Sequence, residues 1–184
     1  MISQKAADFL LEKNIISIDG EVNGEMVGYV RRSIGSFYTK GSPDILILID
    51  SNGGSVSAGL DIYDMLSLYP GEKTAVVVSA AYSMAAVILQ GCSKRMATKH
   101  AWILVHNINS RSVKLDVLRD EKKLADLCRT MEKDQEKLYN IIEKRTGKPR
   151  DVVLAAFAKD EPMTTDDALL FGLLDGIWDK PLPK

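Results

Sequence analysis

Short apolar runs rich in isoleucine and valine alternate with helix-favouring segments along most of the chain. The apolar runs are Ile15–Ile18, Ile45–Ile49, Thr74–Val78 and Trp102–Val105. Helical patterns cover approximately residues 3–12, 25–38 and 57–68. Repeated strand–helix units joined by short turns predict a mainly parallel sheet covered by helices. The alternation therefore indicates an α/β protein.

Ser83 lies where one of these apolar runs passes into a helical segment that ends near Gly91. A serine at a strand-to-helix junction has its hydroxyl lifted clear of the sheet. The amides beside it are the unpaired donors of a helix N-terminus, and such donors can stabilise an oxyanion. The junction therefore predicts a nucleophile, provided that the chain also supplies a base and an orienting acid.

The chain contains two histidines, His100 and His106. His106 ends the run Trp102–Val105, where a side chain can project from a sheet edge, whereas His100 lies in a polar turn and is expected to be exposed. Imidazole titrates in the range that a general base for a hydroxyl needs. A lone histidine is nevertheless more often a packed structural residue. Spacing alone does not select an acid from 25 Asp and Glu residues, although Asp160 lies in a loop between two helical patterns.

Tandem glycines occur in Asp50–Ser55, directly after the run Ile45–Ile49. Glycines at such a position permit positive φ and the close approach of a ligand to backbone amides. Taken alone, the motif is more typical of an ordinary turn.

Together these motifs resemble the proteolytic subunit of the Clp protease. Asp50–Gly59 with Ile62–Asp64 is similar to the family's Asn-Ser-Pro-Gly-Gly-Ser-Val-Xaa-Ala-Gly and Ile-Tyr-Asp pattern. The other similar segments are Ala81–Ala86 around the family's nucleophile, Arg95–Ala97 and Ile103–His106 around its histidine, and Met163–Leu169 with Phe171–Asp175 after its acid. The resemblance extends from about Leu10 to Trp178, with the four motifs in the family's order.

The resemblance implies an α/β fold of the ClpP/crotonase type, a superhelix of repeated strand-strand-helix units forming one domain over residues 1–184. It also implies a catalytic triad of Ser83, His106 and Asp160, with an oxyanion hole formed by the amides of Gly54 and Met84. The implied function is a serine endopeptidase that hydrolyses peptides or unfolded proteins inside an oligomeric chamber, without a cofactor or metal. The order Ser, His, acid and the absence of a Gly-Xaa-Ser-Xaa-Gly elbow argue against a lipase or esterase.

A long stretch without glycine or proline, at about residues 112–146, predicts one helix that ends at Gly147. Such a helix of about 35 residues would be about 50 Å long and would protrude from the body. Leucines in its first half, among them Leu118 and Leu127, are expected to need a partner. In the family this helix is the handle that docks one ring onto another, so the resemblance implies a homo-oligomer, either a heptameric ring or a double ring.

Several positions depart from the family pattern. Asn52 replaces the usual proline, and Tyr82 places a phenol directly before Ser83, where it either narrows the substrate pocket or packs inward. The segment Asn107–Asn109 lacks the family's Gln-Pro and glycine-rich sequence, which puts substrate alignment and double-ring stacking in doubt. The family's N-terminal axial-loop extension is missing, so an ATPase partner is doubtful. Two alternatives stay open: a catalytically silent ring scaffold, and a crotonase-like acyl-CoA enzyme.

Composition excludes several other classes of function. The chain has 184 residues and a formal net charge of −1, which gives no electrostatic reason to expect nucleic acid as a partner. Cys92 and Cys128 are too few for a disulfide framework or a zinc site, and they are expected to be reduced, buried thiols in a cytoplasmic protein. Met1–Lys13 does not resemble a signal peptide, and no apolar run approaches the roughly 20 residues of a membrane span.

Overall fold

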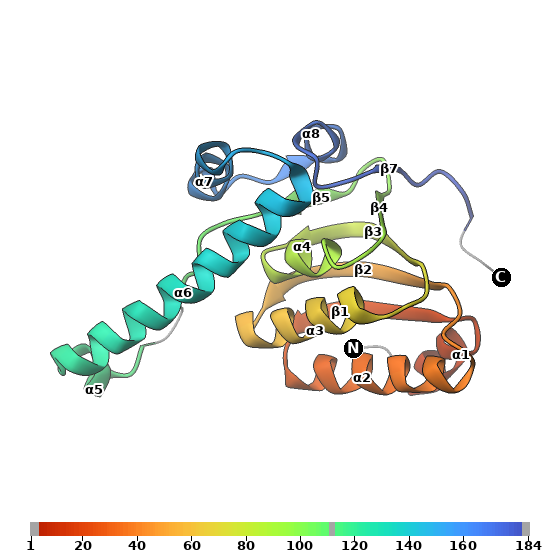
Figure 1. The fold of residues 1–184 in the computed structure, drawn as a ribbon, viewed down its shortest axis with the longest axis horizontal. Helices are drawn as coiled ribbons and strands as arrows, with labels where there is room; N and C mark the ends of the chain where they lie inside the picture. The colour runs from red at the N-terminus through yellow and green to blue at the C-terminus, as the bar shows by residue number, and fades with distance from the viewer. Residues whose placement is uncertain (1–3, 111–112, 182–184) are drawn as a thin grey trace.

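The computed structural model describes residues 4–110 and 113–181. Its main sheet consists of parallel strands in the order β1-β2-β3-β4-β7 (Figure 1). These strands are β1 (Ile15–Val22), β2 (Ile45–Gly54), β3 (Lys73–Tyr82), β4 (Lys94–Ala97) and β7 (Gly176–Ile177). Two more strands join beside this path: β5 (Trp102–Leu104) pairs with β3, and β6 (Met163–Thr164) lies antiparallel to β5.

Eight helices connect and cover the strands within the described residues. They are α1 (Gln4–Glu12), α2 (Gly24–Thr39), α3 (Val56–Leu68), α4 (Met84–Leu89), α5 (Leu115–Leu118), α6 (Glu121–Thr146), α7 (Arg150–Lys159) and α8 (Thr165–Phe171). The α/β class and the parallel sheet predicted from the alternation are confirmed.

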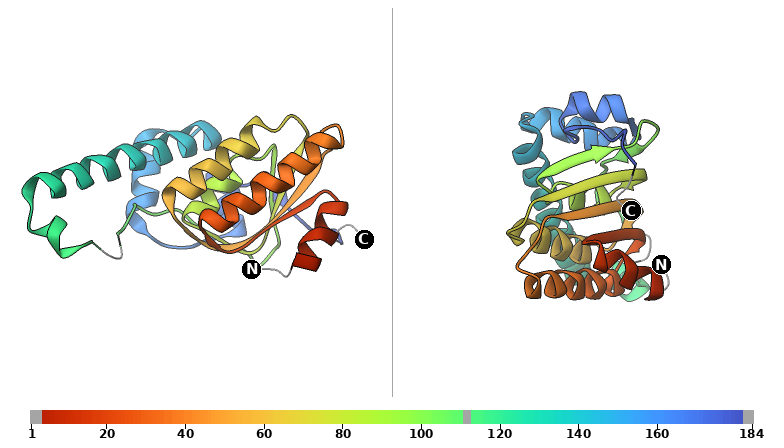
Figure 2. Two further views of the ribbon diagram at one scale, coloured as in Figure 1. Left: turned by 90° about the horizontal axis from the view of Figure 1, so that it is seen from below. Right: turned by 90° about the vertical axis from the view of Figure 1, so that its right-hand side faces the viewer.

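Successive side chains of a strand point to opposite sides, so the apolar strands place side chains on both faces of the sheet. Both faces are covered. One face carries the main core, in which Ile16, Ile47 and Val77 pack under α2, α3 and α4. The other face carries a smaller cluster over which α1 lies (Figure 2). The smaller cluster comprises Ile15, Leu46 and Val76, with Leu10, Leu48, Met96 and Trp178 at its edge.

Strand β3 is longer than the run Thr74–Val78 predicted, and it pairs with two different strands on the same side. Its first part, Thr74–Val77, pairs with β4, and its last part, Ala80–Tyr82, pairs with β5. The chain therefore uses β5 to continue the sheet where β4 stops. As a result, β3 and β5 end side by side at the carboxyl edge of the sheet.

The prediction of a single long helix over about residues 112–146 is wrong. Residues 111–112 lie outside the described residues, α5 is a separate short helix, and α6 begins only at Glu121. The break has a local cause, because the Asp120 side chain accepts a hydrogen bond from the Lys123 amide at 3.1 Å and caps a new helix. With 26 residues, α6 is about 39 Å long at 1.5 Å per residue.

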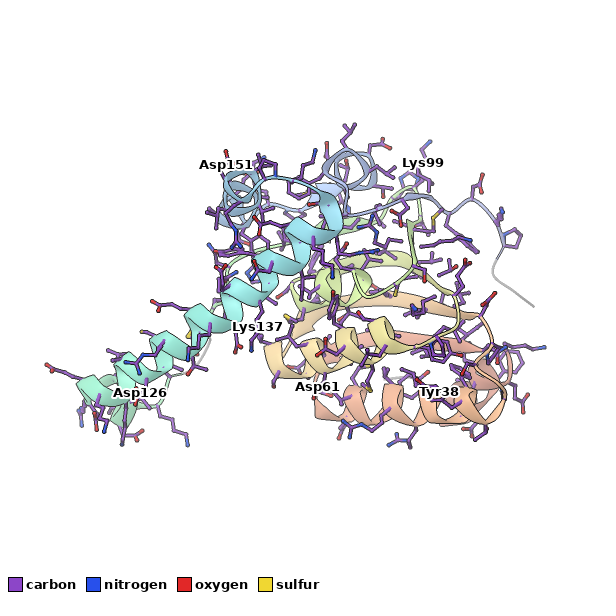
Figure 3. The ribbon with its side chains drawn as sticks, viewed as in Figure 1. Tyr38, Asp61, Lys99, Asp126, Lys137 and Asp151 are labelled. Carbon is purple, nitrogen blue, oxygen red and sulfur yellow. The ribbon has the colours of Figure 1, made fainter. Side chains whose placement is uncertain are left out.

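Helix α6 nevertheless protrudes, as the sequence predicted. Figures 1 and 2 both show its first half, together with α5, extending away from the sheet. In Figure 3, Asp126 lies on this outer part of α6. Lys137 lies nearer the body of the protein, where α6 passes α3, the helix that carries Asp61. A surface cavity of about 550 Å³ between α3 and α6 is lined by both Asp61 and Lys137.

The two cysteines differ in burial, which corrects one expectation. Cys92 is buried, and burial raises the pKa of its thiol to about 12. Cys128 is exposed on α6, because it lies on the part of the helix that extends beyond the sheet. The described residues contain no helix long and apolar enough to cross a bilayer, and no group of three or more acidic, histidine or cysteine side chains arranged to hold a metal ion.

A buried arginine of β4 joins the ends of α4, α6 and α8 and the residue before β7. The Arg95 guanidinium donates to Asp175 through Nε at 3.0 Å and also through its second terminal nitrogen. The other terminal nitrogen donates to Gln90 Oε1 at 2.6 Å, the Gly172 carbonyl at 2.8 Å and the Arg145 carbonyl at 3.3 Å. Burial opposes ionisation of Asp175, but the hydrogen bonds from Arg95 outweigh it and hold the Asp175 pKa below its ordinary value.

Replacing Arg95 by methionine is expected to lower the free energy of unfolding by roughly 2–3 kcal/mol. This cost is below the roughly 3–5 kcal/mol typical of breaking a fully buried ion pair, because part of the Asp175 carboxylate is solvated. A group whose pKa is depressed by folding stabilises the fold above its unfolded pKa and loses that contribution as the pH falls through the folded pKa. The difference between the proteins should thus be full above about pH 4 and shrink below it.

Urea unfolding at fixed protein concentration measures this effect. Lys94→Met is the matched control, because the neighbouring Lys94–Glu72 pair is exposed and is expected to contribute little to stability. Equal destabilisation by the two substitutions would contradict the role given to Arg95.

Candidate active site

Ser83 lies at a sharp turn between the end of β3 and the start of α4. Its backbone has φ 55° and ψ −122°, a conformation that non-glycine residues rarely adopt. The Ser83 amide donates to the Leu104 carbonyl at 2.8 Å, which ties the turn to the end of β5. The Ser83 side chain makes no capping bond to the helix, so its hydroxyl is left for other chemistry.

The glycine motif packs directly against this turn. Gly53 has φ +83°, and a Cβ built there would lie 2.6 Å from the Tyr82 carbonyl oxygen and 2.8 Å from Ser83 Cβ. Only glycine allows this approach of backbone to backbone. The motif is therefore more than the ordinary turn that it resembled in isolation: Asp50–Gly54 continues β2, and Ser55 caps α3.

Gly54 and Met84 line a small cavity together with Ser83 and His106. Met84 is the first residue of α4, so its amide has no partner within the helix. The cavity has a volume of about 60 Å³, and the rest of its wall is mostly apolar. That wall consists of Val56, Val87, Val105, Ile108, Asn109, Leu138 and Phe157.

A larger open cavity of about 730 Å³ passes the same two side chains, Ser83 and His106. Its remaining wall is formed by Gly20, Glu21, Asn52, Gly53, Gly54, Ser55, Asn109 and Ser110. Tyr82 is half-buried and lines neither this cavity nor the small one, so the geometry gives no support to the idea that its phenol narrows the pocket.

The pairing of β3 with β5 explains how Ser83 and His106 come together. Tyr82 is the register partner of Leu104, so Ser83 follows β3 at the level where the chain continues from β5 to His106. Since the carboxyl ends of parallel strands meet at one edge, the two side chains share that edge. His100, in contrast, is exposed, as predicted.

The imidazole of His106 is mostly buried, with 16% of its side chain exposed. Its Nδ1 atom is buried and has no hydrogen-bond partner among the described residues. An acidic oxygen, Asp160 Oδ1, lies 4.0 Å from this Nδ1 atom. This distance exceeds the 2.7–3.2 Å range typical of a hydrogen bond.

Asp160 ends α7 in the left-handed backbone conformation, with φ 51°. Its side chain is 62% exposed and therefore has room to rotate. Its neighbours, Lys159 and Glu161, pair with each other at 2.8 Å and leave the Asp160 carboxylate facing His106. The structure thus places Ser83 and His106 beside one cavity and leaves Asp160, at 4.0 Å from Nδ1, just beyond hydrogen-bond reach of the imidazole.

Two residues of α6 near the site were not predicted. Gln135 and Tyr139 hydrogen-bond the chain directly after His106, at Ile108 and Asn107. Their spacing of four residues on one helix face was visible in the sequence, but it gave no indication of what they would contact.

Comparison with known proteins identifies the family of the chain. A family model described as Clp protease matches residues 2–181. The chain belongs to the Clp protease family. Among its relatives is the ATP-dependent Clp protease proteolytic subunit 1 of Chlamydia caviae, 34% identical over 142 residues, or 72% of this chain and 69% of that protein.

The proteins of the same name from Chlamydia pneumoniae and Chlamydia trachomatis are each 33% identical over the same shares of both chains. The mixed α/β structure with its sheet and helices is consistent with the Clp protease fold. Membership in this family supports a peptidase of the ClpP type and weighs against the crotonase-like acyl-CoA alternative.

Proposed function

We propose that this chain is a serine endopeptidase in which Ser83, His106 and Asp160 form the catalytic triad. The observation that carries the proposal is the shared cavity. Ser83 and His106 line it together with Gly54 and Met84, and Asp160 lies on the Nδ1 side of the imidazole. Acyl transfer needs a nucleophile, a base and oxyanion donors around one small space, and these residues supply them.

The reaction follows from the place of each group. His106 takes the proton of the Ser83 hydroxyl as that oxygen attacks the scissile carbonyl, and then gives the proton to the leaving amine. The amides of Gly54 and Met84 stabilise the tetrahedral oxyanion, each contributing roughly 3–4 kcal/mol in comparable enzymes. Water then enters, and the same base activates it to release the acid product from Ser83.

Asp160 fixes the tautomer of His106 and stabilises the imidazolium. The 4.0 Å separation is long for this role, but catalytic hydrogen bonds are often long before substrate binds. A small rotation of the exposed Asp160 side chain would bring its carboxylate to the unpartnered Nδ1 atom.

A fluorophosphonate probe tests the proposal directly, because it reacts with a serine that has an activated hydroxyl. Mass spectrometry of the labelled protein should locate the adduct on Ser83, with no adduct in Ser83→Ala. Unlabelled wild-type protein in its native assembly would favour the alternative of a silent scaffold.

The substrate class proposed is peptides and unfolded proteins. The open cavity beside Ser83 runs past backbone of β2 and the loop after His106, which suits an extended chain. The apolar wall of the small cavity suits an apolar side chain next to the scissile bond. We take residues 1–184 as one peptidase domain, because the family match covers nearly all of them and one sheet connects the described strands.

Self-association into a ring or a pair of rings is proposed to enclose these sites in a chamber. The support is the protruding end of the molecule, where Leu115 and Leu118 of α5 are 58% and 54% exposed. Relatives are named as subunits of an ATP-dependent protease, which favours an ATPase partner more than the sequence pattern did. Hydrolysis of a short peptide by the triad itself uses no nucleotide. We propose a cytoplasmic location, consistent with the unpaired cysteines.

Replacing both Leu115 and Leu118 by serine is expected to lower the mass of the native particle, because these side chains would lose apolar contact with another copy. Light scattering after size-exclusion chromatography measures the mass. Leu68→Ser is a suitable control, since Leu68 is 79% exposed on α3, away from α5. A particle of wild-type mass in the double variant would exclude α5 as an assembly element.

A further inference from the structure

The chain that follows His106 has no regular secondary structure, although the base of the proposed triad depends on it. Residues 105–110 form neither helix nor strand. The backbone there receives no support from a neighbouring strand, so other contacts must fix it. Two side chains of α6, Gln135 and Tyr139, supply such contacts.

Gln135 and Tyr139 lie four residues apart and therefore on one face of α6. The Ile108 amide donates to Gln135 Oε1 at 2.6 Å. The Tyr139 hydroxyl donates to Asn107 Oδ1 at 2.7 Å. The two residues directly after His106 are thus each held by one hydrogen bond from the same helix.

Tyr139 is itself held in place by contacts of its ring. Its ring packs edge-on against Phe157 of α7, with centroids 4.9 Å apart, and the Arg150 guanidinium lies 5.5 Å from its centre. Arg150 is anchored in turn by Glu143 at 2.7 Å. Phe157 lies three residues before Asp160, so Tyr139 contacts both the segment that carries the proposed base and the helix that ends at the proposed acid.

We propose that Gln135 and Tyr139 are positioning residues that hold the His106 imidazole at Ser83, with Tyr139 also setting the end of α7 that carries Asp160. The inference rests on the proposed function. It deepens that function by assigning the alignment of base and acid to one face of α6. Neither side chain lines the two cavities beside Ser83, so their effect is indirect.

The Tyr139 hydroxyl is available as a donor at neutral pH. Burial, assisted by Glu136, raises the pKa of Tyr139 above its ordinary value, while Arg150 opposes the shift. The proton that bonds Asn107 is therefore retained throughout the pH range in which a histidine base works.

Four substitutions separate positioning from general stability. Tyr139→Phe removes only the hydroxyl and keeps the ring contacts with Phe157 and Arg150. Asn107→Ala removes the acceptor of the same bond. Gln135→Met removes the oxygen that accepts from the Ile108 amide but keeps a side chain of similar size. Gln135→Glu keeps an accepting oxygen at that position. Tyr38→Phe serves as the matched control, because Tyr38 lies on α2 at the end away from α6 (Figure 3).

We expect Tyr139→Phe to lower kcat for a fluorogenic peptide about fivefold with KM unchanged, the size of one lost hydrogen bond. Asn107→Ala should lower kcat similarly, and the double variant should be no slower than either single one, because both remove the same bond. Gln135→Met should lower kcat by about tenfold, because it leaves a partly buried amide unpaired, and Gln135→Glu should restore most of that loss. Tyr38→Phe should match wild type.

Hydrogen exchange of the peptide covering residues 103–110 provides a readout that does not depend on catalysis. Exchange should be faster in Tyr139→Phe and in Gln135→Met, and unchanged in Tyr38→Phe. Faster exchange with wild-type kcat would overturn the inference, since the contacts would then hold the segment without aligning the base. Unchanged exchange would overturn it as well.

Failure of the proposed function gives a different result. If wild-type Ser83 reacts with no fluorophosphonate and no peptide is cleaved, the triad assignment fails and the positioning of a catalytic base fails with it. The exchange measurement then still decides whether α6 holds the His106 segment. With a labelled, active wild type, additive losses in the Tyr139→Phe and Asn107→Ala pair would contradict the inference alone.

Discussion

Replacement of Ser83 by alanine is expected to reduce kcat for a peptide substrate by about 10⁶-fold, the loss typical of removing a triad nucleophile. The structure gives the reason, because the Ser83 hydroxyl is free of any capping bond and borders the cavity that His106 also lines. Alanine fits the same backbone, so the melting temperature should stay close to that of wild type. Fluorogenic peptide cleavage and thermal unfolding measure the two quantities.

His106→Ala should cause a loss of similar size, and the double variant should be no worse than either single variant, since the two groups act as one unit. Ser79→Ala and His100→Ala are matched controls, because both residues are exposed. Wild-type turnover in Ser83→Ala would show that the nucleophile has been assigned to the wrong residue.

Replacement of Asp160 by asparagine is expected to lower kcat by about 10²–10³-fold. In triad proteases, an amide at this position costs about 10⁴-fold because it favours the wrong imidazole tautomer. We expect a smaller loss here, because the Asp160 carboxylate is 62% exposed and starts 4.0 Å from His106 Nδ1. The rate of fluorophosphonate labelling at Ser83 should fall in parallel, with the fold retained.

Glu161→Gln is the matched control for this change. Glu161 is an adjacent, exposed carboxylate that pairs with Lys159, so its loss should leave kcat within about twofold of wild type. If Asp160→Asn behaves like Glu161→Gln, the acid of the triad lies elsewhere or the site works as a dyad.

Local patterns in the sequence predicted the fold class and most of its elements. Apolar runs of β-branched residues gave β1, β2, β3 and β5, because burial on both faces of a parallel sheet selects such residues. Ser83 was recognisable from its place between an apolar run and a helical segment, and Gly53 and Gly54 were recognisable because a positive φ favours glycine. The predicted helix was longer than α6, because α6 begins after a capping residue, Asp120, and not after a glycine or proline.

The exposure of Cys128 was not predictable from the residues next to it in the sequence. Cys128 lies on a helix whose first half extends past the sheet, and its exposure depends on where the body of the protein ends. A periodic apolar stripe predicts that a helix has a packed face. It does not tell how far along the helix the packing continues.

What the sequence by itself determined is the fold class, most of the strands and the candidates Ser83 and His106 at strand ends, because these depend on short-range patterns, whereas Asp160 was selected only by the resemblance to the Clp protease family. What only the tertiary structure decided is their distance from one another. Ser83 and His106 line one cavity because β3 changes partner from β4 to β5, and the packing of α7 on α6 places Asp160 4.0 Å from the imidazole. Such contacts join residues far apart in the chain, and local periodicity carries no record of them.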